Sequence, residues 1–440
     1  MNSLTGTFWA IALASLLAGG LSACNTNGGM VPGPLRSPLP SPSPSPTQAP
    51  IGASGPAAQV PLSSFKVLHA FSGGSDGANP DASLIDVSGT LYGTTIRGGG
   101  GSACPPGSCG TVYSVSRTGV EKALHRFNFG EGSGPTAPVI DVNGRLYGTT
   151  AGGGPVPCPG LGAGTVFTVS MTGHEKVLHS FGERSDGAVP VAGLIDVKGT
   201  LYGTTAQGGG AGCYVGSGTV FSISTTGVET PLYRFAGGSD GGGPQSALID
   251  VKGTLYGTTY YGGGSGCYGG CGTVYTISTT GAEKVLYRFA GGTDGAAPAA
   301  GLINVNGTLY GTTTGGGNSN CNGGCGTVYS ISTSGAEKLW YRFAGGTDGA
   351  YPTTLIDMNG ALYGTTTGGG GSKCYGGCGT VFSVSTAGTE RVLHRFRGGF
   401  DGSVPTGLTD VKGVLYGTTL DGGLRCFQKI ECGVIFTLSP

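Results

Sequence analysis

One five-residue motif, Leu-Tyr-Gly-Thr-Thr, occurs seven times along this chain of 440 residues. Its tyrosines follow one another at intervals of 53 to 55 residues. Self-similarity at a constant period of this length is typical of architectures in which each repeat forms one supersecondary unit. The period therefore limits the fold to a repeat architecture with seven units. The seven tyrosines are Tyr92, Tyr147, Tyr202, Tyr256, Tyr310, Tyr363 and Tyr416.

The fourth repeat shows how one unit divides into four strand-like pieces, at 248–251, 254–259, 272–278 and 284–289. Short turns with glycine separate the first piece from the second and the third from the fourth, as tight hairpins require. Four antiparallel strands make a blade with two apolar faces, which blades arranged radially cover for one another. We expect an all-β fold, a seven-bladed β-propeller of four-stranded antiparallel blades. A parallel β-helix is the alternative, but its coils are shorter and lack repeated hairpin turns.

The two ends of the repeat region carry complementary strands. The first piece, 65–71, has the sequence of a fourth strand, whereas the last, 433–439, has that of a third strand. We therefore expect the N-terminal strand to join the C-terminal blade, begun by residues 405–440, and so to close the ring. The propeller should span residues 65–440.

The N-terminal segment, residues 1–23, has the features of a cleaved export signal, because an apolar stretch ends in small residues before a polar run. Residues 21–24 (LSAC) resemble the lipobox of bacterial lipoproteins, which implies cleavage before Cys24 and acylation of that residue. Several buried acyl chains, at about 0.8 kcal/mol per methylene, would anchor the protein on a membrane. We expect an exported lipoprotein of the outer membrane or cell surface. A plain secretory signal with an incidental cysteine is the alternative, since no Lys or Arg precedes the apolar stretch.

Residues 24–64 contain the run LRSPLPSPSPSPTQAP and little that could pack. Proline-rich segments favour extended polyproline-like conformations of about 3.1 Å per residue. We interpret this segment as a lipid-anchored tether that holds the propeller roughly several tens of ångströms from the membrane.

The charge pattern excludes some classes of partner. Charged residues make up 10% of the chain, and Lys+Arg balance Asp+Glu at 23 each. No basic stripe is present that would bind nucleic acid through counterion release. The sequence also lacks a G-x-S-x-G elbow, a nucleotide-type glycine loop and a carboxylate pair outside the repeat. We expect no cofactor, no metal and no catalysis in a monomeric propeller, although propeller enzymes can assemble sites from scattered residues.

The repeat consensus resembles that of a known family. The pattern I-D-V-x-G-x-L-Y-G-T-T, followed by G-G-G and G-T-V-[YF]-[ST]-[IV]-S, is similar to the tandem GloVer (Gloeo/Verruco) repeats of exported bacterial "choice-of-anchor" proteins, whose members carry different surface attachments. The resemblance covers residues 65–440. It implies a repeat architecture and a surface location, and it brings no established activity and no catalytic residues.

Twelve cysteines follow Cys24, and ten of them form close pairs between the second and third strands of their repeats. In an exported protein such pairs are typical of disulfides, each contributing on the order of 2 kcal/mol. Zinc binding is the alternative, but these loops lack histidine. Cys158 and Cys213 have no partner in their own repeats and, in adjacent blades, can bridge each other. The ten are Cys104 with Cys109, Cys267 with Cys271, Cys321 with Cys325, Cys374 with Cys378, and Cys426 with Cys432.

Acidic residues and histidines also recur at fixed positions. An Asp-Gly pair follows the fourth strand in six repeats, whereas Glu131-Gly132 takes its place at the start of the second blade. Asp caps turns through the backbone, so we interpret these residues as structural, with calcium or ligand binding as the alternative. Four histidines share one fourth-strand position with tyrosines, which indicates packing with a hydrogen-bonding tip. The residues concerned are Asp76, Asp186, Asp240, Asp294, Asp348, Asp401, His69, His125, His179 and His394.

The long connections of the repeat suggest a binding surface. In a four-stranded blade, the loop from second to third strand and the connection to the next blade emerge on one face, which we call the loop face. Binding sites concentrate on loops carried by rigid scaffolds, and exposed tyrosines suit glycan or protein surfaces. We expect the loop face to bind an extracellular glycan or protein. The residues that would do so are Arg97, Tyr214, Tyr260, Tyr261, Tyr268, Asn318, Asn320, Tyr351, Tyr375 and Phe400.

Three alternatives to this binding function stay open. The variable side chains can be solvated loop tips without a partner. The same face can carry the site of an exported polysaccharide hydrolase or lyase. The blade edges can serve as a scaffold within an envelope complex.

Overall fold

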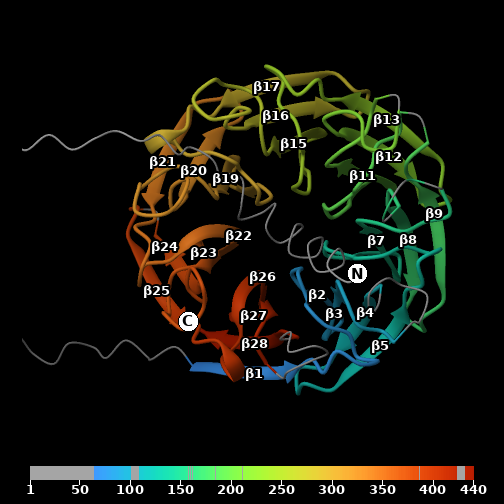
Figure 1. Ribbon diagram of the computed structural model, residues 1–440, viewed down its shortest axis with the longest axis horizontal. Helices are drawn as coiled ribbons and strands as arrows, with labels where there is room; N and C mark the ends of the chain where they lie inside the picture. Colours follow the sequence, from blue (N-terminus) through green and yellow to red (C-terminus); the bar gives the residue numbers. More distant parts are fainter. Residues whose placement is uncertain are drawn as a thin grey trace, which may run out of the picture.

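The computed structural model describes residues 64–100, residues 109–423 without 157, 159, 161, 184, 211 and 386, and residues 432–440. Within these residues, 28 strands form seven four-stranded antiparallel sheets arranged in a ring (Figure 1). The seven-bladed propeller expected from the repeat is confirmed. The described part of the chain has no α-helix, only two short 3-10 turns, and none of its helices could cross a membrane.

Each blade runs from an inner first strand to an outer fourth strand, and Figure 1 shows β2, β22 and β26 nearer the centre than β5, β25 and β1. Blades 1 to 3 consist of β2 (Ile85–Val87), β3 (Thr90–Thr95), β4 (Thr111–Val115), β5 (Glu121–Arg126); β6 (Ile140–Val142), β7 (Arg145–Thr150), β8 (Thr165–Ser170), β9 (Glu175–Ser180); and β10 (Ile195–Val197), β11 (Thr200–Thr205), β12 (Thr219–Ser224), β13 (Glu229–Arg234).

Blades 4 to 6 follow the same order, with longer first and second strands in blade 6. They consist of β14 (Ile249–Val251), β15 (Thr254–Thr259), β16 (Thr273–Ser278), β17 (Glu283–Arg288); β18 (Ile303–Val305), β19 (Thr308–Thr313), β20 (Thr327–Ser332), β21 (Glu337–Arg342); and β22 (Ala350–Met358), β23 (Ala361–Gly368), β24 (Thr380–Val384), β25 (Glu390–Arg395).

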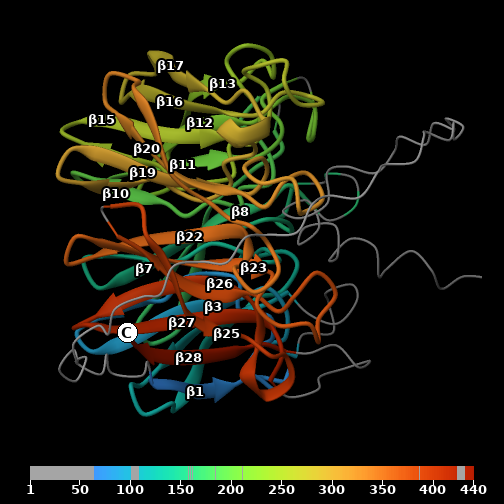
Figure 2. The ribbon, with the colours of Figure 1, turned by 90° about the vertical axis from the view of Figure 1, so that its left-hand side faces the viewer.

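Blade 7 is assembled from both ends of the chain. Its strands β26 (Ser403–Val411), β27 (Val414–Asp421) and β28 (Val434–Ser439) are joined by β1 (Ser64–Ala70), which pairs antiparallel with β28. Figure 2 shows these four strands side by side. The Phe65 ring stacks on the His394 ring of blade 6 at a centroid distance of 3.8 Å. The N-terminal strand thus closes the ring, as expected from the sequence.

The hairpin between the first and second strands explains the I-D-V-x-G part of the repeat. In blade 4, Lys252 and Gly253 both have positive φ angles, 56° and 87°, as a type I′ turn requires. The Asp250 carboxylate accepts a hydrogen bond of 2.8 Å from the Gly253 amide. This aspartate therefore caps a turn.

The glycine of the Leu-Tyr-Gly-Thr-Thr motif makes room for an aromatic ring. A Cβ atom on Gly257 would lie 2.6 Å from Cζ of Tyr275, which follows on the third strand of the same blade. The Tyr275 ring is completely buried and meets Phe235, at the end of blade 3, edge to face with centroids 5.1 Å apart. Such pairs contribute roughly 0.5 to 1.5 kcal/mol beyond the area they bury.

All seven blade junctions contain an equivalent edge-to-face pair, with centroids 4.9 to 5.2 Å apart. One ring ends the fourth strand of a blade and the other lies on the third strand of the next. The pairs are Phe71–Tyr113, Phe127–Phe167, Phe181–Phe221, Phe235–Tyr275, Phe289–Tyr329, Phe343–Phe382 and Phe396–Phe436.

The two threonines of the motif add polar contacts around these rings. Thr258 donates a hydrogen bond of 3.1 Å to the carbonyl of Pro298, which leads into the next blade. The hydroxyls of Thr259 and Thr273 lie 2.8 Å apart and join the second strand to the third. The glycine and both threonines of the motif therefore have structural roles, which helps to account for its sevenfold repetition.

Candidate functional site

The long connections meet on the loop face, as the topology predicts. Isolated bridges pair the connection that enters a blade with the loop between that blade's second and third strands. Ala188 pairs with Gln207 in this way, Gly242 with Tyr261, and Ala296 with Gly315. The loops of the loop face are thus held in a continuous band rather than standing separately.

Disulfides reinforce this band. Cys267–Cys271, Cys321–Cys325 and Cys374–Cys378 close the loops of blades 4, 5 and 6. Cys158–Cys213 joins the loop of blade 2 to that of blade 3, which is the bridge that the sequence left open. Cys109 and Cys432 are also disulfide-bonded. Their expected partners, Cys104 and Cys426, lie outside the described residues, as does Cys24.

Three of the expected binding residues project fully from the loop face. Tyr268 and Tyr375 occupy the same position between paired cysteines in blades 4 and 6, and their side chains are 99% and 108% exposed. Phe400, in the connection from blade 6 to blade 7, is 77% exposed. In blade 5 the corresponding position is Asn322. These three side chains lie on blade 4, on blade 6 and in the connection between blades 6 and 7.

The other seven expected residues make contacts within the protein. The Tyr351 hydroxyl donates to the Asn322 carbonyl at 3.3 Å, and the Asn320 amide donates to the Ala344 carbonyl at 3.1 Å. Tyr214 donates to the Gly162 carbonyl at 2.8 Å. The remaining contacts are those of Asn318 with the Asn320 amide, of the Tyr261 ring with Gly242 and Gly243, of Tyr260 with Thr314, and of Arg97 with Asp421.

One exposed residue of the loop face was missed by sequence reasoning. Val215 follows Tyr214 in the loop of blade 3 and is well exposed. Its position two residues after Cys213 and directly before a glycine was the available signal.

The repeated turn aspartates have the structural role expected of them. Asp348 accepts hydrogen bonds from the Tyr341 hydroxyl at 2.8 Å and from the Ala344 amide at 2.6 Å. Arg395 of the next blade donates to the adjoining Thr347 carbonyl at 2.8 Å. A turn that ends one blade is therefore held by the next blade.

Histidine and tyrosine interchange because both reach this turn carboxylate. Nε2 of His179 lies 3.1 Å from the Asp186 carboxylate, just as Tyr233 lies 3.1 Å from that of Asp240. Three of the histidines, His125, His179 and His394, thus pack with a hydrogen-bonding tip, as the sequence indicates. The fourth, His69, lies 3.9 Å from the Asp76 carboxylate and makes no hydrogen bond through Nε2 to any described residue.

A row of glutamates at the blade junctions was not anticipated from the sequence. Each glutamate begins a fourth strand and is half-buried near the turn carboxylate of the preceding blade. Burial and, secondly, the Asp348 carboxylate raise the pKa of Glu390 to about 8, while Arg395 opposes the shift. The signal was the fixed position of six residues: Glu121, Glu175, Glu229, Glu283, Glu337 and Glu390.

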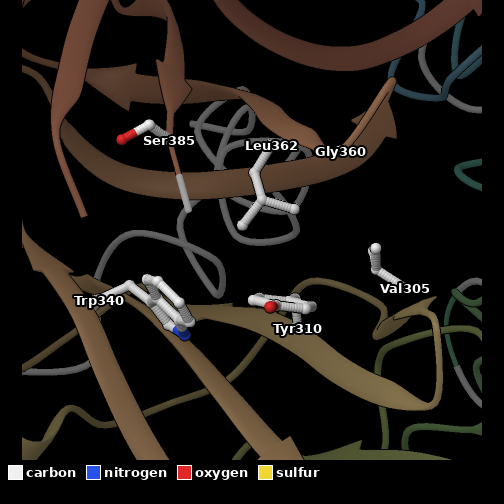
Figure 3. A pocket seen from close by; sticks show the side chains of 6 residues that line it. All are labelled: Val305, Tyr310, Trp340, Gly360, Leu362 and Ser385. Atoms are coloured by element: carbon white, nitrogen blue, oxygen red, sulfur yellow. The ribbon is translucent and has the colours of Figure 1, made fainter. Parts of the chain in front are cut away.

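Two hollows lie away from the loop face. A cavity of about 20 Å³ between blades 5 and 6 is lined by Tyr310, Trp340 and Leu362 among others (Figure 3), and has room for about one water molecule. A polar hollow of about 500 Å³ lies where the hairpin turns of blades 4 and 5 meet, beside Lys252 and Asn306. Its walls are turn residues of the repeat, so it has no chemistry special to these blades.

Comparisons with known proteins support the repeat interpretation. The model of the family described as the Gloeobacter/Verrucomicrobia repeat matches residues 57–216 and 211–436. A search of curated protein sequences finds no significant match.

Similar solved structures include the computationally designed Ika8 protein, which is 15% identical with a TM-score of 0.46, covering 84% of this chain and 98% of the other. BamB from Moraxella catarrhalis is 13% identical with a TM-score of 0.44, covering 86% and 98%. A putative 6-phosphogluconolactonase from Bacteroides uniformis is 12% identical with a TM-score of 0.44, covering 72% and 84%.

The junction glutamates predict a pH-dependent stability that Glu390→Gln changes. Because the folded protein raises the pKa of Glu390 from 4.5 to about 8, stability falls as the pH rises through this window. The variant should therefore be more stable than the wild type above about pH 8, by about 1 kcal/mol after solvent screening. Urea unfolding at several pH values measures the difference.

The exposed Glu183 provides the control, since Glu183→Gln removes a carboxylate that is not buried. The difference between Glu390→Gln and the wild type should vanish below pH 4.5, the ordinary pKa of the group. A difference that stays constant across the pH range would contradict this assignment.

Proposed function

The chain belongs to the Gloeobacter/Verrucomicrobia repeat family, and on this premise we propose that it is an exported, surface-anchored propeller that binds an extracellular glycan or protein through its loop face. The disulfides fit an exported protein, because such bonds form and persist in oxidising compartments. The proposal assigns no catalysis to the loop face.

The observation that carries this proposal is the full exposure of Tyr268 and Tyr375 at the tips of disulfide-closed loops. A tyrosine ring offers a large, flat surface that is apolar on its faces and polar at its tip. Each tyrosine lies between two disulfide-bonded cysteines, which already restrict the loop. Less conformational entropy of the loop is therefore lost when a partner binds. These are favourable properties for contacts with sugar rings or with a protein surface.

The spacing of the exposed side chains favours an extended partner. Tyr268 lies on blade 4, Tyr375 on blade 6 and Phe400 in the connection to blade 7, while Tyr214 and Val215 continue the arc on blade 3. A ligand as small as a monosaccharide would contact one of these loops. We therefore expect a polymer or a protein that crosses several blades.

The test is a triple variant, Tyr268→Ala, Tyr375→Ala and Phe400→Ala, in the full mature chain. Because these side chains are exposed, the thermal midpoint should not change, whereas affinity for the partner should fall at least about tenfold, as loss of aromatic hot spots does. Binding is measured first on a glycan array and then against proteins of the cell surface.

A matched control removes exposed apolar side chains from the opposite face, by Val120→Ala and Val228→Ala in the hairpins between third and fourth strands. Binding that is lost in this control but retained in the triple variant would refute the loop-face proposal. Release of reducing sugars from a bound polysaccharide would instead identify a hydrolase or lyase. Partner binding lost only on substitution of the outer strands would identify a scaffold.

The membrane anchor is a second part of the proposal. Residues 21–24 (LSAC) precede the proline-rich tether, and we infer that the mature chain begins at an acylated Cys24. Mass spectrometry of the N-terminal peptide from the native membrane fraction should show a lipid-modified Cys24 as the first residue. A mature N-terminus elsewhere, or an unmodified Cys24, would rule out lipid anchoring.

A further inference from the structure

The junction between blades 1 and 2 departs from the pattern of its neighbours. At five junctions an arginine ends the incoming fourth strand, where its charge opposes the rise that burial causes in the pKa of the half-buried glutamate beside it. In blade 2 this position is Ser180, and the turn carboxylate that faces it is Glu131 instead of aspartate. The arginines at the other junctions are Arg126, Arg234, Arg288, Arg342 and Arg395.

Because Ser180 replaces the arginine and Glu131 replaces the aspartate, this junction brings two carboxylates and an imidazole together. Nε2 of His125 lies 3.1 Å from Oε2 of Glu131, and ligand atoms of His125, Glu131 and Glu175 all lie within 4.8 Å of one another. The His125 and Glu131 side chains are 15% and 29% exposed. One oxygen of Glu175 is buried and has no hydrogen-bond partner among the described residues.

The electrostatics of this cluster lack a positive partner. Burial and then the Glu131 carboxylate raise the pKa of Glu175 to about 7, and no neighbouring arginine opposes them. Burial lowers the pKa of His125, although Glu131 opposes this shift. Two half-buried carboxylates beside an imidazole form a set of donors that a cation would stabilise.

We propose that this junction binds a divalent transition-metal ion of the zinc type through Nε2 of His125 and one carboxylate oxygen each of Glu131 and Glu175. Zinc binds imidazole nitrogen and carboxylate oxygen at about 2.0 to 2.2 Å, so its ligands lie roughly 3 to 4 Å apart, close to the observed spacing. Calcium is disfavoured because it takes about six to eight oxygen ligands.

The ion would supply the positive charge that arginine supplies at other junctions. Glu131 belongs to the turn that leaves blade 1, whereas Glu175 begins the fourth strand of blade 2. Coordination by both therefore fastens one blade to the next. Partial exposure of the cluster leaves a fourth coordination position to water.

A neighbouring junction has similar residues and shows what is special here. His179, Asp186 and Glu229 occupy the same positions between blades 2 and 3, but Arg234 lies beside them. Only the group of His125, Glu131 and Glu175 has its ligand atoms close enough together, among the residues that the structure describes. The two junctions thus form a matched pair for experiment.

The experiment titrates Zn²⁺ into the full mature chain, prepared without a histidine tag and freed of metal by a chelator. Calorimetry should show one saturable Zn²⁺ per chain, and the thermal midpoint should rise with Zn²⁺. His125→Tyr should weaken binding at least about tenfold. Tyrosine occupies the equivalent position in blades 3, 4 and 5, as Tyr233, Tyr287 and Tyr341, so this variant should fold.

Two further variants make the result decisive. His179→Tyr, the matched control, should leave Zn²⁺ binding unchanged. Ser180→Arg introduces at this junction the arginine that five other junctions have. It should abolish Zn²⁺ binding without lowering the thermal midpoint of the metal-free protein. The proposal is overturned if no saturable binding occurs, if binding survives both His125→Tyr and Ser180→Arg, or if His179→Tyr weakens it equally.

Discussion

Seven edge-to-face aromatic pairs, one at each blade junction, are the interaction on which the rest of this propeller depends. Each pair needs a glycine on the adjacent second strand, because a Cβ atom there would meet the third-strand ring. Two hydrogen bonds also connect neighbouring blades. One is donated by the first threonine of the Leu-Tyr-Gly-Thr-Thr motif, and the other by the arginine at the end of the fourth strand. Removing water from these rings is the main favourable contribution, and the polar contacts fix the angle at which blades meet.

Within this one chain, the blade junctions repeat the same geometry, whereas the loop face varies from blade to blade. The strands and turns repeat because every junction has to satisfy the same packing. The loop face is free of that requirement, and disulfides such as Cys158–Cys213 keep its loops ordered where strands end. The junction of blades 1 and 2 shows an intermediate case, in which Ser180 and Glu131 replace the usual arginine and aspartate while the aromatic pair Phe127–Phe167 is kept.

The sequence predicts features that are local within one repeat. The strand pieces, the turn role of residues such as Asp348 and the closure by residues 65–71 follow from hairpin signals and from the period. Contacts between blades could not be predicted in the same way: the glutamate row and the Phe65–His394 stack depend on which side chains face each other across a junction. Loop side chains were the least predictable. Composition cannot show that Tyr375 points outward while the Tyr351 hydroxyl donates a hydrogen bond to the Asn322 carbonyl.

Thermal unfolding of a Gly311→Ala variant tests the central role of the aromatic pairs most directly. A Cβ atom on Gly311 would lie 2.7 Å from Cζ of the buried Tyr329, so the Phe289–Tyr329 pair would be displaced. We predict a loss of about 1 to 3 kcal/mol, seen as a lowered thermal midpoint. Gly238→Ala, where a Cβ atom meets open space, should have no such effect. Equal midpoints for the two variants would contradict the account.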